Sequence, residues 1–271
     1  MGKIRITWVI LYVIPLLYSC QKEYLFPNAE RKLKTKYTYA SSKHKEPYAR
    51  TDYYYDESWN LIKDIVVFKP DPITFKNTYK YMEGKLIEKR HYGIPQGSSS
   101  IGLTESALTL YDKYLYAYPS VDVKIEKHYD MEENLLKDSV VYEYMGESLV
   151  KESHYDRKGN FRWGKEYQYD QEGNLVKEVE YPEEMYSVYF YKNGKKIKVR
   201  QYDRNGSVMV ENNYIYKKEN GYDVVEVHYS GYYGKFISSK SFYKNGLLVE
   251  LIKYHPTFIG AEWVCYRYEY Y

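Results

Sequence analysis

The sequence predicts an all-β protein, a long antiparallel meander of hairpin repeats whose sheet is twisted or curled into a barrel-like or half-barrel form. Three observations predict this fold. Segments in which side-chain character alternates with a period of two recur along the chain. Short turn motifs of Asp, Asn and Gly separate these segments. The 271 residues include 39 tyrosines, and aromatic side chains favour strands.

The alternation is clear between residues 175 and 181. Leu175, Val179 and Tyr181 fall on one face of this segment, and Glu178 and Glu180 fall on the other. A period of two is the spacing of side chains on a strand, so it predicts strands of about 7 to 10 residues. About fourteen such strands are expected, and an open sheet of that size curls.

Two kinds of turn motif connect the expected strands. In the longer kind, which begins Tyr-Asp, the Asp carboxylate accepts a hydrogen bond from the backbone two residues on, and Asn or Gly allows a positive φ. The shorter kind contains Asn-Gly or a similar pair and is typical of tight hairpins. The longer copies lie at 55–61, 129–135, 155–161, 169–175 and 202–206, and the shorter ones at 81–84, 144–146, 191–194 and 243–246.

Residues 1–19 have the features of a secretory signal peptide. Lys3 and Arg5 precede an apolar run from Ile6 to Leu17. A run of about 12 residues is short for a membrane-spanning helix and normal for a signal peptide. The alternatives are an uncleaved signal anchor and an ordinary signal with a chance cysteine.

The end of this segment, Leu17-Tyr18-Ser19-Cys20, resembles the lipobox of bacterial lipoproteins. In that family the cysteine thiol is diacylated, the signal is cut before it, and the new N-terminus is acylated. The resemblance therefore implies that Cys20 is lipidated and that the acyl chains hold the protein at the membrane. Without residues 1–19 the chain has 38 basic and 37 acidic side chains, so attraction to anionic lipid is not expected to contribute.

The rest of the chain divides into a short tether and one domain. We expect residues 20–36 to form the lipidated N-terminus and tether, and residues 37–271 to form the tyrosine-rich β-repeat domain. An irregular insertion is expected at 93–120, where a Gly/Ser-rich loop precedes a segment that suits a strand or a short helix. Long loops in β folds often carry function, so this insertion is a candidate contact with a ligand or partner.

The turn motifs carry a second resemblance. Tyr-Asp-x-x-Gly-Asn-Leu, as at 169–175, resembles the YD repeats of bacterial cell-surface and toxin-shell proteins, and Phe-Tyr-Lys-Asn-Gly at 190–194 and 242–246 is similar to MORN-type repeats. Together with the lipobox, the chain resembles uncharacterised tyrosine-rich YD-repeat lipoproteins of Gram-negative bacteria, over most of residues 50–255. The resemblance implies β-hairpin repeats and an envelope role, and it implies no catalytic residues.

Candidate metal ligands do not converge in the sequence. Four histidines directly precede a tyrosine and occupy one repeat position near a strand end, where a structural role is expected. They are His91, His128, His154 and His228. The turn with Asp170, Glu172 and Asn174 presents oxygens, but its glycine is placed unlike that of an EF-hand. We expect no metal and no cofactor.

The sequence also disfavours catalysis and nucleic-acid binding. No nucleophile elbow and no phosphate-binding glycine loop is present, so we expect no catalytic residues. Once Cys20 is acylated, Cys265 has no cysteine to pair with, and a buried apolar role is expected for it. A net charge of +3 disfavours a nucleic-acid partner.

These features predict a non-enzymatic lipoprotein that presents a β-repeat domain for binding or scaffolding at the envelope. It is expected at the outer membrane, on the surface or the periplasmic face. Exposed aromatic rows suit an extended glycan or peptide, and Tyr114, Tyr116, Tyr232 and Tyr233 are the candidate binding residues. The competing interpretations are an immunity-type lipoprotein that binds and neutralises a toxin protein, and a glycan-binding surface lipoprotein.

Overall fold

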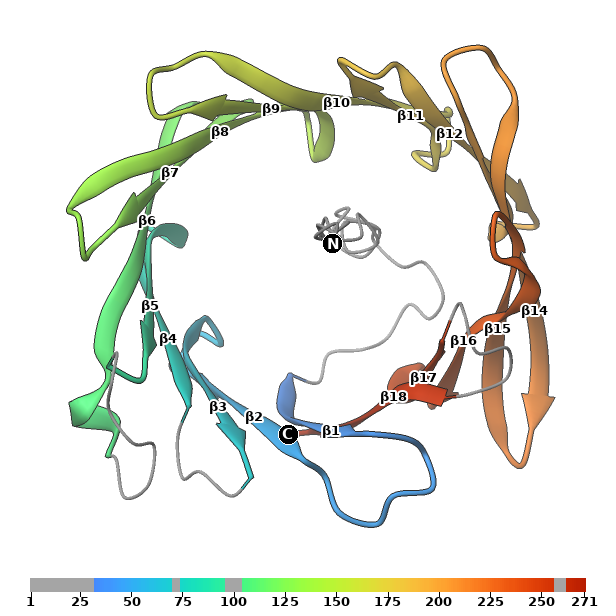
Figure 1. Ribbon diagram of the computed structural model, residues 1–271, viewed down its shortest axis with the longest axis horizontal. Helices are drawn as coiled ribbons and strands as arrows, with labels where there is room; N and C mark the ends of the chain where they lie inside the picture. The colour runs from blue at the N-terminus through green and yellow to red at the C-terminus, as the bar shows by residue number, and fades with distance from the viewer. Residues whose placement is uncertain (1–31, 70–73, 96–103, 256–261) are drawn as a thin grey trace, which may run out of the picture.

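The computed structural model describes residues 32–69, 74–95, 104–255 and 262–271. In these residues the chain forms one antiparallel sheet of 18 strands, closed into a barrel (Figure 1). β1 pairs with both β2 and β18, so closure leaves no free edge in this sheet. The predicted all-β meander is confirmed, with more strands than the about fourteen expected. Among the described residues, no helix has the length and apolar character needed to cross a membrane.

The strands follow one another around the barrel in chain order, and a single 3-10 turn, η1, precedes β6 in the described residues. Their bounds are β1 Leu33–Tyr39, β2 Ala49–Tyr55, β3 Leu61–Phe68, β4 Phe75–Met82, β5 Lys85–Gly93, η1 Glu105–Ala107, β6 Thr109–Ser120, β7 Val123–Asp130, β8 Leu135–Met145, β9 Ser148–Asp156, β10 Phe161–Tyr169, β11 Leu175–Tyr181, β12 Met185–Lys192, β13 Lys195–Tyr202, β14 Val208–Glu219, β15 Tyr222–Gly231, β16 Gly234–Lys244, β17 Leu247–Tyr254 and β18 Glu262–Tyr270.

Two segments differ from the sequence-based expectation. β1 begins at Leu33, inside the predicted tether 20–36, so the barrel starts before residue 37. The predicted signal peptide and Cys20 lie outside the described residues. The predicted insertion 93–120 contains the 12-residue strand β6, whose alternating tyrosines follow the same period of two as the other strands. Residues 96–103 of that insertion also lie outside the described part of the chain.

The two kinds of turn motif have the geometry that their residues predict. In the tight hairpin between β12 and β13, Asn193 and Gly194 both have positive φ, at 51° and 70°. In the longer turn between β9 and β10, Asp156 Oδ1 accepts the backbone N–H of Lys158 at 2.8 Å and that of Asn160 at 2.9 Å. The Asn160 side-chain amide also donates to Asp156 Oδ2, at 3.1 Å, and closes the turn.

Contacts of η1 distinguish the outer from the inner face of the sheet. The segment that leads into β6, green at the lower left of Figure 1, lies outside the ring. Glu105 of η1 pairs with Lys63 of β3 at 3.4 Å and with Lys76 of β4 at 3.5 Å, so these lysines face outward. Successive side chains alternate between faces, and their neighbours Asp64 and Asn77 therefore face inward. We extend this assignment around the barrel through directly paired residues, which share a face.

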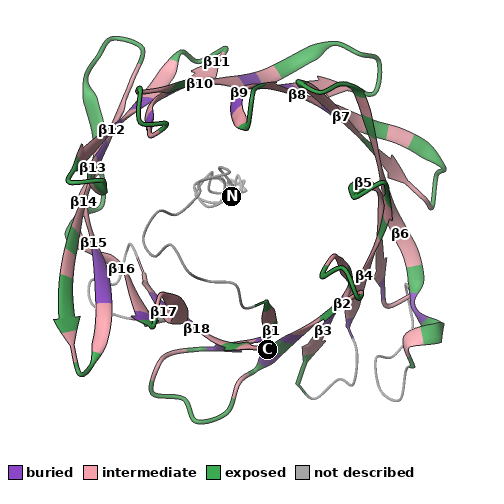
Figure 2. Ribbon diagram, turned by 180° about the vertical axis from the view of Figure 1, so that it is seen from behind, coloured by how far each residue is buried: buried purple, intermediate pink, exposed green. Residues whose placement is uncertain are grey.

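The barrel has two different rims. The even-numbered strands all end at one rim, which we call the tyrosine rim; the described chain also begins there, at Lys32, and ends there, at Tyr271. In Figures 1 and 2 the turns of the tyrosine rim lie within the outline of the ring, whereas those of the opposite rim project beyond it. The barrel is therefore narrower at the tyrosine rim.

Packing is that of a single sheet with two accessible faces. The largest fully buried side chains are only Val224 and Cys265. On the outer face, Cys265 packs with Tyr39 and Ile252, next to Arg267, which donates to the carbonyl of Ser42 at 2.9 Å. Burial raises the pKa of the Cys265 thiol to about 12. The predicted buried role of this cysteine is confirmed.

Candidate functional site

Tyrosines line the inner face of the barrel. Every even-numbered strand carries at least one, most often at positions i and i+2 near the tyrosine rim, and we call this set the inner tyrosine rows. Its members are Tyr53, Tyr55, Tyr79, Tyr81, Tyr114, Tyr116, Tyr118, Tyr142, Tyr144, Tyr167, Tyr169, Tyr189, Tyr191, Tyr214, Tyr216, Tyr243, Tyr266, Tyr268 and Tyr270. Barrels of 16 to 18 strands are too wide for side chains to fill, so these rings border a wet interior.

Five of these tyrosines fix neighbouring strands together at the tyrosine rim. They lie on β2, β6, β10, β14 and β18, so one occurs on every fourth strand. Each donates its hydroxyl to a backbone carbonyl of the preceding strand. The five bonds are Tyr55 to Leu33 at 2.9 Å, Tyr118 to Leu86 at 2.9 Å, Tyr169 to Leu149 at 2.7 Å, Tyr216 to Lys196 at 2.8 Å and Tyr270 to Leu248 at 2.7 Å. The rings thus stabilise the wall as well as line it.

Other inner tyrosines donate to carboxylates of the preceding strand. Tyr79 donates to Asp64 at 2.6 Å, and Tyr189 donates to Glu178 at 3.0 Å. Glu178 also pairs with Lys165 of β10 at 2.6 Å, and both side chains are nearly buried. The carboxylates are therefore held by defined partners and face the same interior as the rings.

The inner polar groups have shifted acidities with identifiable causes. Burial, aided by the neighbouring carboxylates, raises the pKa of Tyr79 and of Tyr189. Burial also raises the pKa of Glu126. Burial acts the same way on Glu152, but hydrogen bonds from His154 and Tyr167 outweigh it and lower that pKa. All these phenols are neutral hydrogen-bonding groups near neutral pH.

Lysine ammonium groups lie over several inner rings. Lys124 lies 4.0 Å from the ring centre of Tyr142 and 5.7 Å from that of Tyr116. Tyr114 lies between Lys89, at 5.1 Å, and the imidazole of His128, which stacks on it at 4.4 Å. Such contacts order the rings and leave a wall that alternates aromatic and charged groups.

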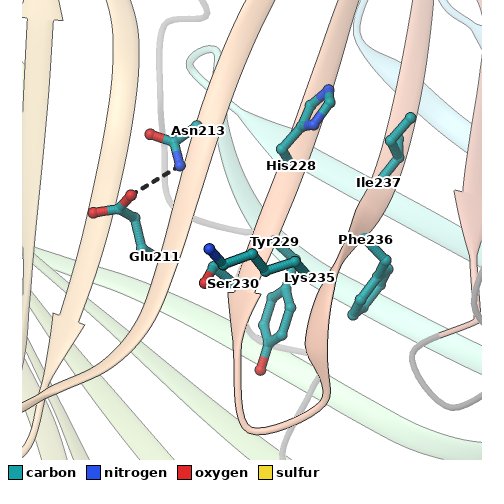
Figure 3. A pocket seen from close by; sticks show the side chains of 8 residues that line it. All are labelled: Glu211, Asn213, His228, Tyr229, Ser230, Lys235, Phe236 and Ile237. Atoms are coloured by element: carbon teal, nitrogen blue, oxygen red, sulfur yellow. Dashed lines mark hydrogen bonds between the residues drawn. The ribbon is translucent and has the colours of Figure 1, made fainter.

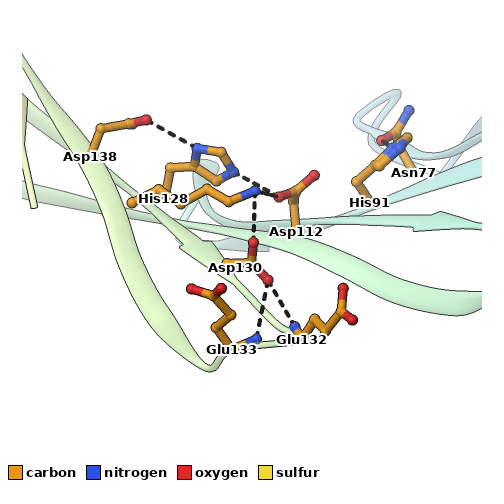
Figure 4. Close-up of polar contacts among 9 residues, drawn as sticks. Asn77, His91, Asp112, His128, Asp130, Glu132, Glu133 and Asp138 are labelled. Atoms are coloured by element: carbon orange, nitrogen blue, oxygen red, sulfur yellow. Dashed lines mark hydrogen bonds and ion pairs between the residues drawn. The ribbon is translucent and has the colours of Figure 1, made fainter.

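A charged network surrounds His128 on β6 to β8 (Figure 4). His128 lies between Asp112, at 2.9 Å, and Asp138, at 3.3 Å. Lys137 bridges Asp112, at 2.9 Å, and Asp130, at 3.1 Å. Burial opposes the charge on Asp112, but Lys137 and His128 lower its pKa overall. Each of these carboxylates therefore has a hydrogen-bond or ion-pair partner in the network.

Metal ligands do not gather in the described part of the chain: no group of three or more His, Cys, Asp or Glu side chains there is arranged to hold a metal ion. At the turn of Asp170 and Asn174, both carboxylate oxygens already accept hydrogen bonds from Asn174, at 2.8 and 3.0 Å. These bonds lower the pKa of Asp170. The carboxylate there closes the turn.

The four predicted binding tyrosines fall into two separate places. Tyr114 and Tyr116 belong to the inner tyrosine rows, on β6. Tyr232 and Tyr233 form the turn between β15 and β16 at the opposite rim, where Tyr232 is 90% exposed and the two rings meet at 5.2 Å. The structure does not bring these pairs together. The inner carboxylates are not among the residues predicted from the sequence. Their signal is the Tyr-x-Tyr pattern of the strands that pair with them.

The four histidines that precede a tyrosine do not all lie on the same face of the sheet. His91, His128 and His154 face inward, whereas His228 faces outward with Glu226. The ladder between β14 and β15 runs without a bulge, whereas those between β4 and β5 and between β8 and β9 contain one. A shift of one residue moves all following side chains to the other face.

Figure 3 shows a pocket of about 310 Å³ over β14 to β16, with strands of the opposite wall behind it. Three of its polar side chains, Glu211, Asn213 and His228, already have partners. Glu211 accepts from Asn213 at 2.9 Å and from Arg200 at 2.6 Å, and these bonds lower its pKa to about 2. We assign no ligand to this pocket.

Comparisons with known proteins give distant likenesses only. No family model matches the chain, and no curated protein matches it. A crystal structure of TcdB2-TccC3 without its hypervariable C-terminal region is 11% identical, with a TM-score of 0.37, over 82% of this chain, which spans 14% of that one. A porin-like protein from Bacteroides uniformis is 7% identical, with a TM-score of 0.32, over 91% of this chain and 98% of that one. A protein of unknown function from Bacteroides fragilis is 15% identical, with a TM-score of 0.28, over 50% of this chain and 87% of that one.

Proposed function

We propose that the chain is a non-enzymatic lipoprotein of the cell envelope, anchored through Cys20, whose barrel binds an extended glycan on its inner face. The observation that carries the proposal is the set of inner tyrosine rows. Sugars present apolar C–H faces that stack on aromatic rings, and hydroxyls that bond charged groups. Partly exposed rings such as Tyr114 and Tyr116, alternating with carboxylates and ammonium groups, offer both.

The position of the chain ends supports anchoring. Tyr271 donates its backbone N–H to the carbonyl of Lys32 at 3.0 Å, so both ends of the described chain meet at the tyrosine rim. Cys20 precedes Lys32 by twelve residues, which span at most about 40 Å. An acylated Cys20 would hold the tyrosine rim toward the bilayer and the opposite rim away from it.

The outer wall supports a barrel that stands in water beside the membrane. Glu226, at the middle of β15, pairs with Lys217 at 2.8 Å and with Lys240 at 2.7 Å. Burial opposes its charge, but these partners lower its pKa to about 2. On β17, Glu250 pairs with Arg267 at 2.9 Å. Charges at mid-strand are costly on a wall that faces lipid chains.

The paired state of the inner charges supports binding over catalysis. Asp64 accepts from Tyr79 and from Asn77, at 2.6 and 2.9 Å, and Glu178 is held by Lys165 and Tyr189. Groups that position one another in this way form a preorganised wall for ligand contacts.

Binding to a glycan array tests the proposal. The chain from residue 21, which contains the whole described barrel, is applied to oligosaccharides of bacterial envelopes and host surfaces, and hits are titrated by calorimetry. We expect Tyr116→Ala, on the inner face, to weaken binding about tenfold or more. Tyr54→Ala, an exposed tyrosine on the outer face of β2, is the matched control and should bind normally.

Two results would contradict the glycan proposal. One is equal loss of binding in the inner and outer variants at unchanged thermal stability. The other is saturable one-to-one binding of a toxin protein with no affinity for any sugar, which would favour the immunity-type interpretation.

A further inference from the structure

Exposed apolar side chains lie in or directly before four consecutive turns at the tyrosine rim. They are Trp59 in the turn between β2 and β3, Met82 at the last residue of β4, Val121 in the turn between β6 and β7, and Met145 at the last residue of β8. Their exposures are 51%, 61%, 88% and 71%. Tyr271, which follows β18 at the same rim, is 51% exposed, and its ring meets that of Trp59 at 6.0 Å.

The other four turns of this rim are polar at their tips. They contain Asp170–Asn174, Lys192–Lys195, Glu219–Gly221 and Lys244–Gly246. The apolar tips therefore occupy one continuous half of the rim and are not scattered around it. Exposed apolar side chains gathered on one side of a rim mark a candidate contact surface.

The described chain begins at this half of the rim. Lys32 bonds to Tyr271, and Tyr55 contacts both Trp59 and Tyr271, at ring distances of 6.0 and 6.1 Å. The lipobox cysteine lies twelve residues before Lys32, and those residues reach at most about 40 Å. A lipid on Cys20 would therefore bring this half-rim within reach of a bilayer.

We propose that this half-rim, formed by Trp59, Met82, Val121, Met145 and Tyr271, rests in the interfacial region of a lipid bilayer. Trp and Tyr favour that region because each combines an apolar body with a polar group. Lys34, whose ammonium group lies 5.9 Å from the ring centre of Tyr271, can place its charge among the headgroups. The contact would tilt the barrel, lower the apolar half toward the membrane and keep the polar half in water.

This inference goes beyond glycan binding, and it uses the anchor at Cys20 only to choose the occupant. The opposite rim also exposes apolar side chains, including Phe161, Val208 and Met209. They lie where no chain end meets the barrel, so they provide a matched control.

Vesicle flotation with the unlipidated chain from residue 21 tests the proposal. The vesicles contain phosphatidylethanolamine and phosphatidylglycerol at 3:1 in one series and phosphatidylcholine alone in the other. We expect the chain to float with both, with little dependence on salt, because the contact is apolar and the mature chain is nearly neutral. For the variant Trp59→Ser/Met82→Ser/Val121→Ser/Met145→Ser, we expect the partition coefficient onto vesicles to fall at least about tenfold. Phe161→Ser/Val208→Ser/Met209→Ser should float like the parent.

Three results would overturn the proposal. They are recovery of the parent chain free of vesicles, flotation of the rim variant at the parent's level, and a dimer of the parent that the rim variant abolishes. The last result would assign the half-rim to a second copy of the chain. None of them affects acylation of Cys20, which palmitate labelling measures separately, or glycan binding by the inner face.

Discussion

Replacing the five rim tyrosines that donate to backbone carbonyls with phenylalanine is expected to lower the free energy of unfolding by about 5 kcal/mol. The five substitutions are Tyr55→Phe, Tyr118→Phe, Tyr169→Phe, Tyr216→Phe and Tyr270→Phe. Each removes one hydroxyl and leaves a partly buried carbonyl without its donor, at a cost of about 1 kcal/mol.

The effects should add because the five bonds are far apart. From β2 to β18 they occur on every fourth strand, and only Tyr270 and Tyr55 are as close as two strands. Denaturant unfolding measures the total. The control carries Tyr48→Phe, Tyr54→Phe and Tyr232→Phe, three exposed tyrosines, and should change little. A fivefold variant as stable as this control would mean that the rim bonds do not hold the barrel together.

Glu178→Gln is expected to be the most damaging single change on the inner face, at about 3 kcal/mol. Glu178 accepts from Lys165 at 2.6 Å and from Tyr189 at 3.0 Å, and it is 8% exposed. The amide removes the negative charge and leaves the Lys165 ammonium group nearly buried with Glu180 as its nearest carboxylate, at 3.9 Å.

The double variant Lys165→Met/Glu178→Met separates loss of the pair from exposure of an unpaired charge. It should recover most of the lost stability in denaturant unfolding, because an apolar pair of similar size replaces a buried ion pair at little cost. Glu211→Gln, in a more exposed outer pair with Arg200, is the matched control and should cost less. Equal losses in both Gln variants would contradict the burial argument.

Local patterns predict the strands and turns of this protein well. Alternation and the Tyr-Asp and Asn-Gly motifs predict hairpins because each depends on a few consecutive residues, as at Asn193-Gly194. Closure is different, since it depends on β1 pairing with β18, and Tyr39 meets Cys265 only across the whole chain. No short motif encodes that pairing.

The binding face could be predicted only in part. Tyr114 and Tyr116 are predicted from the sequence as members of an exposed aromatic row. Which side of the sheet they occupy depends on curvature and bulges. Glu152 and Glu226 show the difficulty, since each is followed two residues later by His, yet one faces inward and the other outward. The ladder between β8 and β9 contains a bulge and that between β14 and β15 does not, and this difference decides which face each Glu occupies. Bulges leave little trace in sequence.

Thiol labelling on β6 tests most directly whether the tyrosines line the interior of a closed barrel. Tyr116→Cys places a thiol on the inner face, and Ala117→Cys places one on the exposed outer face one residue later. The chain from residue 21 lacks Cys20, and Cys265 is buried with a raised pKa, so neither native thiol interferes. We expect a small maleimide to react at both positions. A maleimide on a large dextran, excluded from a barrel roughly 35 Å wide, should react at least about tenfold faster at residue 117 than at residue 116. Equal rates with the dextran reagent would contradict the closed barrel and the inward position of its tyrosines.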